Sequence, residues 1–214
     1  MSLWTSSVIG LLLLQTVQLQ VIKSNDDGKP VTIEAETRSS SEEPTRALVL
    51  QDKDWNVTQA YSDAFRILSD PNACSSFYGG PRKATIVLND FVSRVKPRVL
   101  SREVAFQMTG RARFVFNSHS EVFYRLFEKT LVNLNGSFYQ RRADPMNRFP
   151  SDIGDFQPGT RRARALILLH ELGHLIQDVN GDWLLPDDGF NGPISRANTE
   201  RVQQACRAQL ESLH

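Results

Sequence analysis

Residues 160–181 read TRRARALILLHELGHLIQDVNG, and this stretch decides what kind of fold the chain can adopt. It is almost wholly apolar from Ala165 to Ile176, which predicts a helix buried on most of its faces. Thr160 is suited to cap the start of this helix, and Asn180-Gly181 is suited to end it. A helix of this kind needs other elements packed around it, so we expect a domain with a substantial core.

Three polar residues interrupt the apolar stretch: His170, Glu171 and His174. Histidines four residues apart lie on one face of a helix, so both imidazoles can reach a single ion, and Glu171 lies beside them near a metal-bound water. Burying these groups costs several kcal/mol unless they find partners, and a divalent ion satisfies all three. Asp178, one turn further on, is placed to support the ligands. In the alternative without metal, the histidines bond to backbone carbonyls and Glu171 pairs with an arginine.

Residues 169–174, LHELGH, resemble the active-site helix of the zincin metallopeptidases. The resemblance covers the motif helix alone, so it implies a superfamily and no particular subfamily. It implies that His170 and His174 bind Zn²⁺ and that Glu171 is the general base, which polarises the attacking water and then passes the proton to the leaving amine. The implied activity is that of a zinc-dependent metallopeptidase, a hydrolase acting on peptides or proteins.

The family patterns leave the third metal ligand open. A metzincin would have Gly at position 177 and His at position 180, and Gln177 and Asn180 exclude that subclass. A thermolysin-like enzyme would carry a glutamate further along the chain, and Glu200 lies just beyond the expected range. An aspzincin would carry an aspartate near residue 185, where the nearest following acids are Asp187 and Asp188.

Helix geometry favours Asp188 as the third ligand. Residues 195–213 are expected to form a helix whose buried stripe leaves Glu200 on the solvent side. After Gly181 the chain can reverse, and the residues up to Asp188 can span about 25 Å at most, which is enough to return to the histidines. We therefore predict Asp188, with Asp187 and Glu200 as alternatives. The expected stripe comprises Asn198, Val202, Ala205, Cys206 and Gln209.

The predicted fold class is α+β, with one zincin-like domain over residues 47–214 and a small sheet packed on the motif helix. Further helices are expected at 57–68, 84–100 and 122–134, the second in preference to a strand, and a turn or short helix is expected around Cys74. Alternation over 104–116 predicts a hairpin turning at Thr109-Gly110 or one long bent strand. Residues 135–160 are expected to form a long loop that lines a cleft or is a solvated insertion.

The first 46 residues are expected to lie outside this domain. The apolar run from Val8 to Leu14 is far shorter than the roughly 20 residues that span a bilayer, so we predict a signal peptide over 1–22 and no stable membrane anchor. The alternative is a poorly ordered tail. Residues 23–46 contain few large apolar side chains and are predicted to be a disordered linker. These features favour a secreted or periplasmic protein.

Composition narrows the classes of partner. The 214 residues include 25 basic and 24 acidic side chains, a formal net charge of +1, which argues against a nucleic-acid partner. In an exported chain, Cys74 and Cys206 would form a disulfide that stabilises the fold by about 4 kcal/mol. Two buried free thiols in a cytosolic protein are the alternative. The oligomeric state cannot be read from the sequence.

Two classes of function therefore remain. The first is a zinc metallopeptidase with Glu171 as general base. The second is a non-catalytic zincin-like domain that keeps a structural metal, or a binding module without metal. The two classes differ in metal content and in turnover of a protein substrate.

Overall fold

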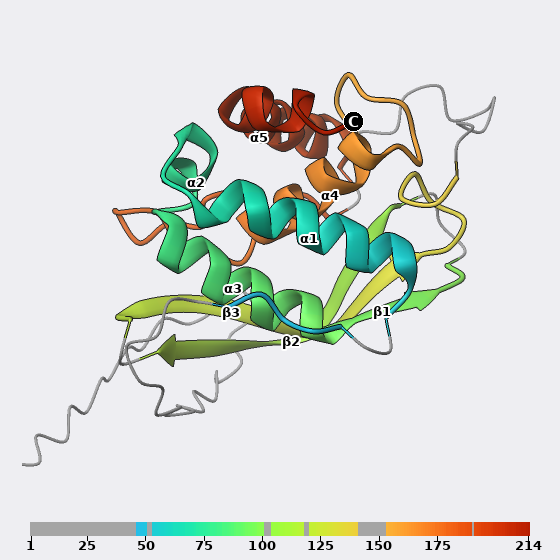
Figure 1. Ribbon diagram of the computed structural model, residues 1–214. Helices are drawn as coiled ribbons and strands as arrows, with labels where there is room; N and C mark the ends of the chain where they lie inside the picture. The colour runs from blue at the N-terminus through green and yellow to red at the C-terminus, as the bar shows by residue number, and fades with distance from the viewer. Residues whose placement is uncertain (1–45, 51–52, 101–103, 118–119, 141–152, 190) are drawn as a thin grey trace, which may run out of the picture. The chain divides into compact units, whose positions relative to one another are not determined.

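The computed structural model describes residues 46–50, 53–100, 104–117, 120–140, 153–189 and 191–214. They form five helices and a three-stranded sheet, so the α+β prediction is confirmed (Figure 1). The predicted signal peptide at 1–22, and the predicted linker at 23–46 except for Arg46, lie outside the described residues. Most of the middle of the predicted 135–160 loop lies outside them as well.

The helices match most of the sequence predictions. They are α1 (Trp55–Ser69), α2 (Ala73–Phe77), α3 (Pro81–Arg94), α4 (Arg161–Gly173) and α5 (Gly192–Glu211). The predictions of helices at 57–68 and 195–213 and of a short helix around Cys74 are confirmed. The helix predicted at 84–100 is confirmed only as far as Arg94, where the chain enters a strand. In the described part of the chain, no helix has the length and apolarity needed to cross a membrane.

The sheet is mixed and has the order β1-β3-β2. Strand β1 (Val95–Arg98) runs parallel to β3 (Val122–Asn133), and β2 (Phe106–Asn117) runs antiparallel to β3. Strand β2 is continuous, with a register shift between Thr109 and Ala112 and a positive φ of 90° at Gly110. The long bent strand is thus confirmed, and the hairpin at Thr109-Gly110 is wrong because Gly110 forms a bulge and not a turn.

The prediction of a helix over 122–134 is wrong, because these residues form β3. The segment is rich in β-branched and aromatic side chains, which pack well on a pleated sheet. Its residues pair across the sheet, for example Phe123 with Phe116 and Leu131 with Gln107. Buried Val122, Tyr124 and Leu126 alternate along the strand, so the period is two residues and not three to four.

The sheet packs mainly on α3, whereas α4 packs between α1 and α5 (Figure 1). On the sheet side, the Tyr124 hydroxyl donates to the Asp90 carboxylate of α3, and the rings of Phe91 and Phe106 lie 6.0 Å apart. The expectation that the sheet packs directly on the motif helix is therefore wrong. Helix α3 occupies that position because its own apolar stripe also needs a partner.

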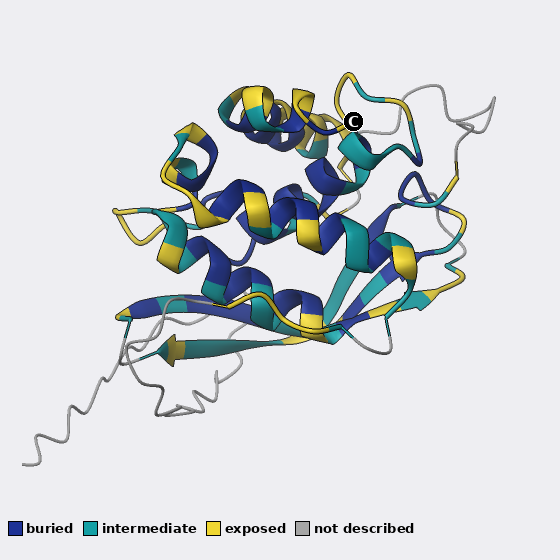
Figure 2. Ribbon diagram, viewed as in Figure 1, coloured by how far each residue is buried: buried dark blue, intermediate teal, exposed yellow. Residues whose placement is uncertain are grey.

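Helix α4 is the buried helix that the sequence predicts (Figure 2). Thr160 caps its start, accepting from the backbone N–H of Ala163 at 3.2 Å. Its apolar side chains are fully buried: Ala163, Ala165, Leu166, Ile167, Leu168, Leu169 and Leu172. They fill the space between α1 and α5, which makes α4 the centre of the core.

The predicted end of α4 at Asn180-Gly181 is wrong, because the helix ends at Gly173. Beyond His174 the backbone pairs with other segments: Leu175 accepts from the N–H of Arg125, and Ile176 bridges to Tyr124 of β3. Strand β1 pairs with β3 only from Thr130 onward, so this part of the β3 edge is available. The pairing of residues 175 and 176 with β3 supplies hydrogen bonds for backbone N–H and C=O groups that would otherwise lack partners at the strand edge.

Arginines anchor the start of α4 to its two neighbours. Arg161 forms a two-bonded ion pair with the buried carboxylate of Asp63 in α1, with both distances 2.6 Å. Arg162 donates to the carbonyl of Leu213, just beyond the end of α5, at 2.8 Å. These contacts fix the position of α4 along α1 and α5, and hence the position of His170 between those helices.

A disulfide joins Cys74 of α2 to Cys206 of α5, across 132 residues of sequence. The predicted pairing is confirmed. Helix α5 packs on α4 and α2, and this bond joins it covalently to α2.

Replacing both cysteines with alanine should destabilise the domain by about 4 kcal/mol and lower its Tm by about 12 °C, because the unfolded chain regains the entropy of a long loop. Thermal unfolding followed by circular dichroism measures the change. Thiol titration of the unreduced, denatured wild type should find no free thiol, and two reactive thiols would disprove the bond.

Candidate metal centre

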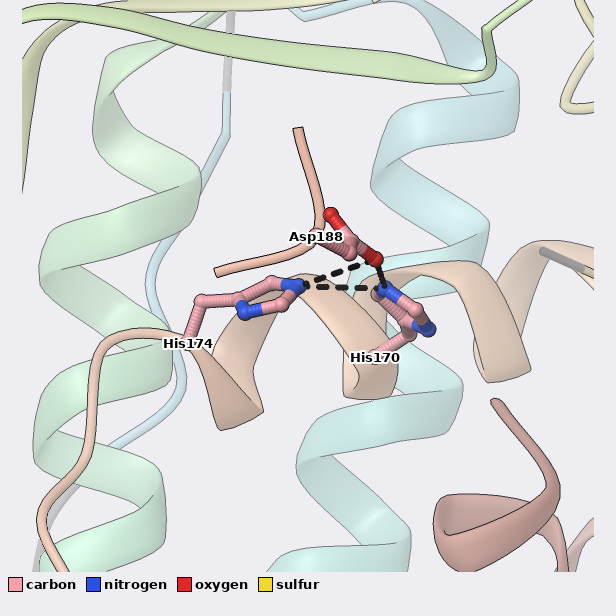
Figure 3. Close-up of side chains that lie close together, drawn as sticks. All are labelled: His170, His174 and Asp188. Atoms are coloured by element: carbon pink, nitrogen blue, oxygen red, sulfur yellow. Dashed lines mark hydrogen bonds and ion pairs between the residues drawn. The ribbon is translucent and has the colours of Figure 1, made fainter. Parts of the chain in front are cut away.

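Two imidazoles and one carboxylate converge where α4 ends (Figure 3). His170 Nε2 lies 3.1 Å from Asp188 Oδ2 and 3.1 Å from His174 Nε2, and His174 Nε2 lies 3.6 Å from Asp188 Oδ2. The histidine side chains are 2% and 5% exposed, and that of Asp188 is 15% exposed. The histidines come from α4, and Asp188 comes from the segment that leads back to α5.

The spacing of the three atoms suits a zinc ion. Zinc bonds to histidine nitrogen and carboxylate oxygen are about 2.0–2.1 Å long, so the corners of a tetrahedral site lie about 3.3 Å apart. The three observed separations, 3.1, 3.1 and 3.6 Å, fall on both sides of that value. The cluster could therefore hold a metal ion with little movement of its side chains.

The hydrogen bonds around His170 also favour a cation. The Thr199 hydroxyl donates to the Ser195 carbonyl at 2.9 Å, so its oxygen acts as the acceptor toward His170 Nδ1–H, also at 2.9 Å. The proton on Nδ1 leaves Nε2 of the neutral ring with a lone pair that faces Asp188. A nitrogen lone pair and a carboxylate oxygen 3.1 Å apart repel each other unless a metal ion or a second ring proton lies between them.

The electrostatics of the cluster correspond to the second of these cases, in which the rings are protonated. Burial by itself would raise the pKa of the Asp188 carboxyl, but hydrogen bonds to His170 and His174 and the charges of the two rings hold that pKa well below its usual value. Burial lowers the pKa of His174, whereas its hydrogen bond to Asp188 and the charges of Glu171, Asp188 and Asp187 raise it, with a net increase. Asp188 is thus ionised, as a metal ligand must be.

Glu171 lies at the side of the cluster. It follows His170 on α4 and is half-buried, and its negative charge is close enough to act on His174. A carboxylate in this position can exchange protons with a water molecule next to the histidines.

The structure separates the candidates for a third ligand. Asp188 lies in the cluster, whereas Asp187 pairs with Arg125 of β3. Glu200 is exposed on α5, as helix geometry predicts. Asp178 accepts from the backbone N–H groups of Asn180 and Asp182 in a turn, so the prediction that it supports the ligands is wrong, because α4 ends before reaching it.

Sequence analysis overlooked two residues that support the cluster. Thr199 bonds to His170, and Arg125 Nε donates to the His174 carbonyl at 2.7 Å. A third residue, Asn198, was expected only to face inward, and it donates to the carbonyl of Pro186 at 3.0 Å, two residues before Asp188. The position of Asn198 in the expected buried stripe of α5 was a signal for that residue, and Thr199 follows it directly in the sequence. No comparable signal marked Arg125, because its segment was predicted to be a helix.

Comparisons with protein-family models, with curated proteins and with solved structures found no match to this chain.

Changing Thr199 to Val should weaken zinc binding about 10- to 100-fold, because the isosteric side chain cannot accept the proton of His170 Nδ1. Zinc affinity measured against a competing chelator tests this. Thr199→Ser keeps the hydroxyl and should retain wild-type affinity. Equal affinities for the Val and Ser variants would contradict this role for the hydroxyl.

Asp188→Ala should reduce zinc affinity far more than Asp187→Ala or Glu200→Ala, because only Asp188 lies against the two imidazoles. The same competition assay ranks the three variants. If Asp188→Ala binds zinc as the wild type does, another group is the third ligand.

Proposed function

We propose that this protein is a zinc-dependent metallopeptidase that hydrolyses peptide bonds with Glu171 as general base. One observation carries the proposal: two imidazole nitrogens and one carboxylate oxygen converge at tetrahedral spacing, and the charge of Glu171 acts on one of those imidazoles. Structural zinc sites use four protein ligands, whereas catalytic sites use three and keep one position open. The cluster found among the described residues has three.

Each residue then has a distinct role. His170, His174 and Asp188 would hold the ion, with Thr199 keeping His170 in the tautomer that presents Nε2. Zinc bound there would lower the pKa of a water in the open position and polarise the substrate carbonyl. The Glu171 carboxylate would take a proton from the attacking water and deliver it to the nitrogen of the leaving amine.

The disulfide supports a location for this activity. Disulfides form and persist in oxidising compartments and are rare in the cytosol. The bond between Cys74 and Cys206 therefore supports the secreted or periplasmic assignment, where peptides and proteins are available as substrates.

A non-catalytic metal site is the second candidate, favoured by burial. The three side chains are at most 15% exposed, which suits an ion retained for stability. Both candidates bind metal, so turnover of a protein substrate distinguishes them. A binding module without metal is the third candidate, in which a second proton on the His170 ring would bond to Asp188.

Glu171→Gln should abolish hydrolysis of an unstructured protein while retaining about one zinc per chain, because the amide cannot accept a proton but leaves the three ligands in place. Elemental analysis and a peptide-release assay measure the two properties. His170→Ala should lose both.

Glu200→Gln is the matched control, because it makes the same change at an exposed position of α5 and should keep full activity. Wild-type turnover in Glu171→Gln would show that another group is the base. A zinc-loaded wild type without turnover would favour the structural site, and absence of zinc would disprove both candidates.

A further inference from the structure

We infer that Arg125 of β3 is a positioning residue that holds two of the three metal-ligand residues in place. The inference rests on the proposed metal site. A single guanidinium bonds to the backbone of His174 and to the side chain next to Asp188. The Arg125 side chain bonds to the His174 carbonyl and to Asp187 and not to the three donor atoms, so it would act through these two neighbours.

The first contact locates His174. Its carbonyl lies at the end of α4, where no later turn of helix supplies a donor, and Arg125 Nε donates to it at 2.7 Å. The Arg125 backbone N–H also donates to Leu175 at 3.0 Å. His174 Nδ1 is buried and has no hydrogen-bond partner among the described residues, unlike His170 Nδ1. The His174 ring is therefore held by its Nε2 contacts within the cluster and by its backbone, which Arg125 holds.

The second contact locates Asp188. The two terminal nitrogens of Arg125 bond to the two carboxylate oxygens of Asp187, with the Nη1–Oδ2 distance 3.2 Å. A paired contact of this kind restrains orientation as well as distance. Because Asp187 and Asp188 are adjacent, restraining one restrains the backbone of the other. The two adjacent acids thus have different partners: Asp187 faces Arg125, and Asp188 faces the imidazoles.

Arg125 is itself held firmly. Its side chain is only 7% exposed, and its guanidinium carbon lies 4.1 Å from the centre of the Trp183 ring and 5.2 Å from that of Phe127. These rings hold the planar group in one orientation. Asp187 also neutralises its charge, which would otherwise repel a divalent cation nearby. Lysine has a single ammonium group and lacks the planar guanidinium. It therefore cannot bond to the His174 carbonyl and to both Asp187 oxygens together.

Arg125→Lys should weaken zinc binding about 10- to 100-fold, as is typical when a partner of a ligand is lost. Asp187→Asn should weaken it by a smaller factor within that range, and it changes a side chain that is 65% exposed, so folding is not at risk. Both changes break the same contact, the Arg125–Asp187 ion pair. The double variant should therefore bind zinc no more weakly than Arg125→Lys alone. Arg201→Lys and Asp182→Asn make the same substitutions at exposed positions and should bind as the wild type does.

A second measurement needs no metal. The chain has four histidines, so their imidazole signals can be assigned by NMR in the metal-free protein. Arg125→Lys and Asp187→Asn should shift the signals of His170 and His174, whereas the two control variants should leave them unchanged. A role confined to global stability would lower the Tm without moving these signals selectively.

The outcomes separate the inference from the proposed function. A wild type that binds no zinc contradicts the proposed function, and the imidazole signals still test the positioning role. Imidazole signals that do not move in either variant overturn the inference, whatever the metal content. Wild-type zinc affinity in both variants overturns it as well.

Discussion

The burial of α4 is the constraint on which the rest of the structure depends. Its leucine and isoleucine side chains are fully enclosed, and each contributes about 1.5–3 kcal/mol when removed from water. Enclosing one helix on nearly every face requires α1 on one side and α5 on another. The same enclosure takes two imidazoles out of water, where polar groups without partners are costly. The candidate metal centre therefore lies within the core and is not an addition to its surface.

The cluster is assembled from elements far apart in sequence. Helix α4 provides His170 and His174, the segment after it provides Asp188, α5 provides Thr199, and β3 provides Arg125. Helix α5 connects these parts to the rest of the domain, because it carries both Thr199 and the half-cystine Cys206. The disulfide bond and the ligand support therefore share one helix, and disturbing either one is expected to affect the other.

Two errors in the sequence predictions have a common cause. Residues 122–134 were predicted to be helical, and α4 was predicted to continue past His174. In both places the conformation is set by hydrogen bonds to another segment. Strand β3 pairs with β2, and Ile176 pairs with Tyr124, in the part of β3 that β1 does not reach. Local apolar spacing is compatible with both conformations, and only the partner decides between them.

By itself, the sequence determined the buried helix, its cap at Thr160, the motif residues, the cysteine pair and the solvent-facing position of Glu200. These features follow from periodicity and residue type, which act over one or two helical turns. Only the tertiary structure decided that Asp188, and not its neighbour Asp187, faces the histidines. Adjacent carboxylates have the same local chemistry, so their roles depend on what surrounds them. Here that is a buried arginine from a strand 62 residues away, which bonds to one and leaves the other for the imidazoles.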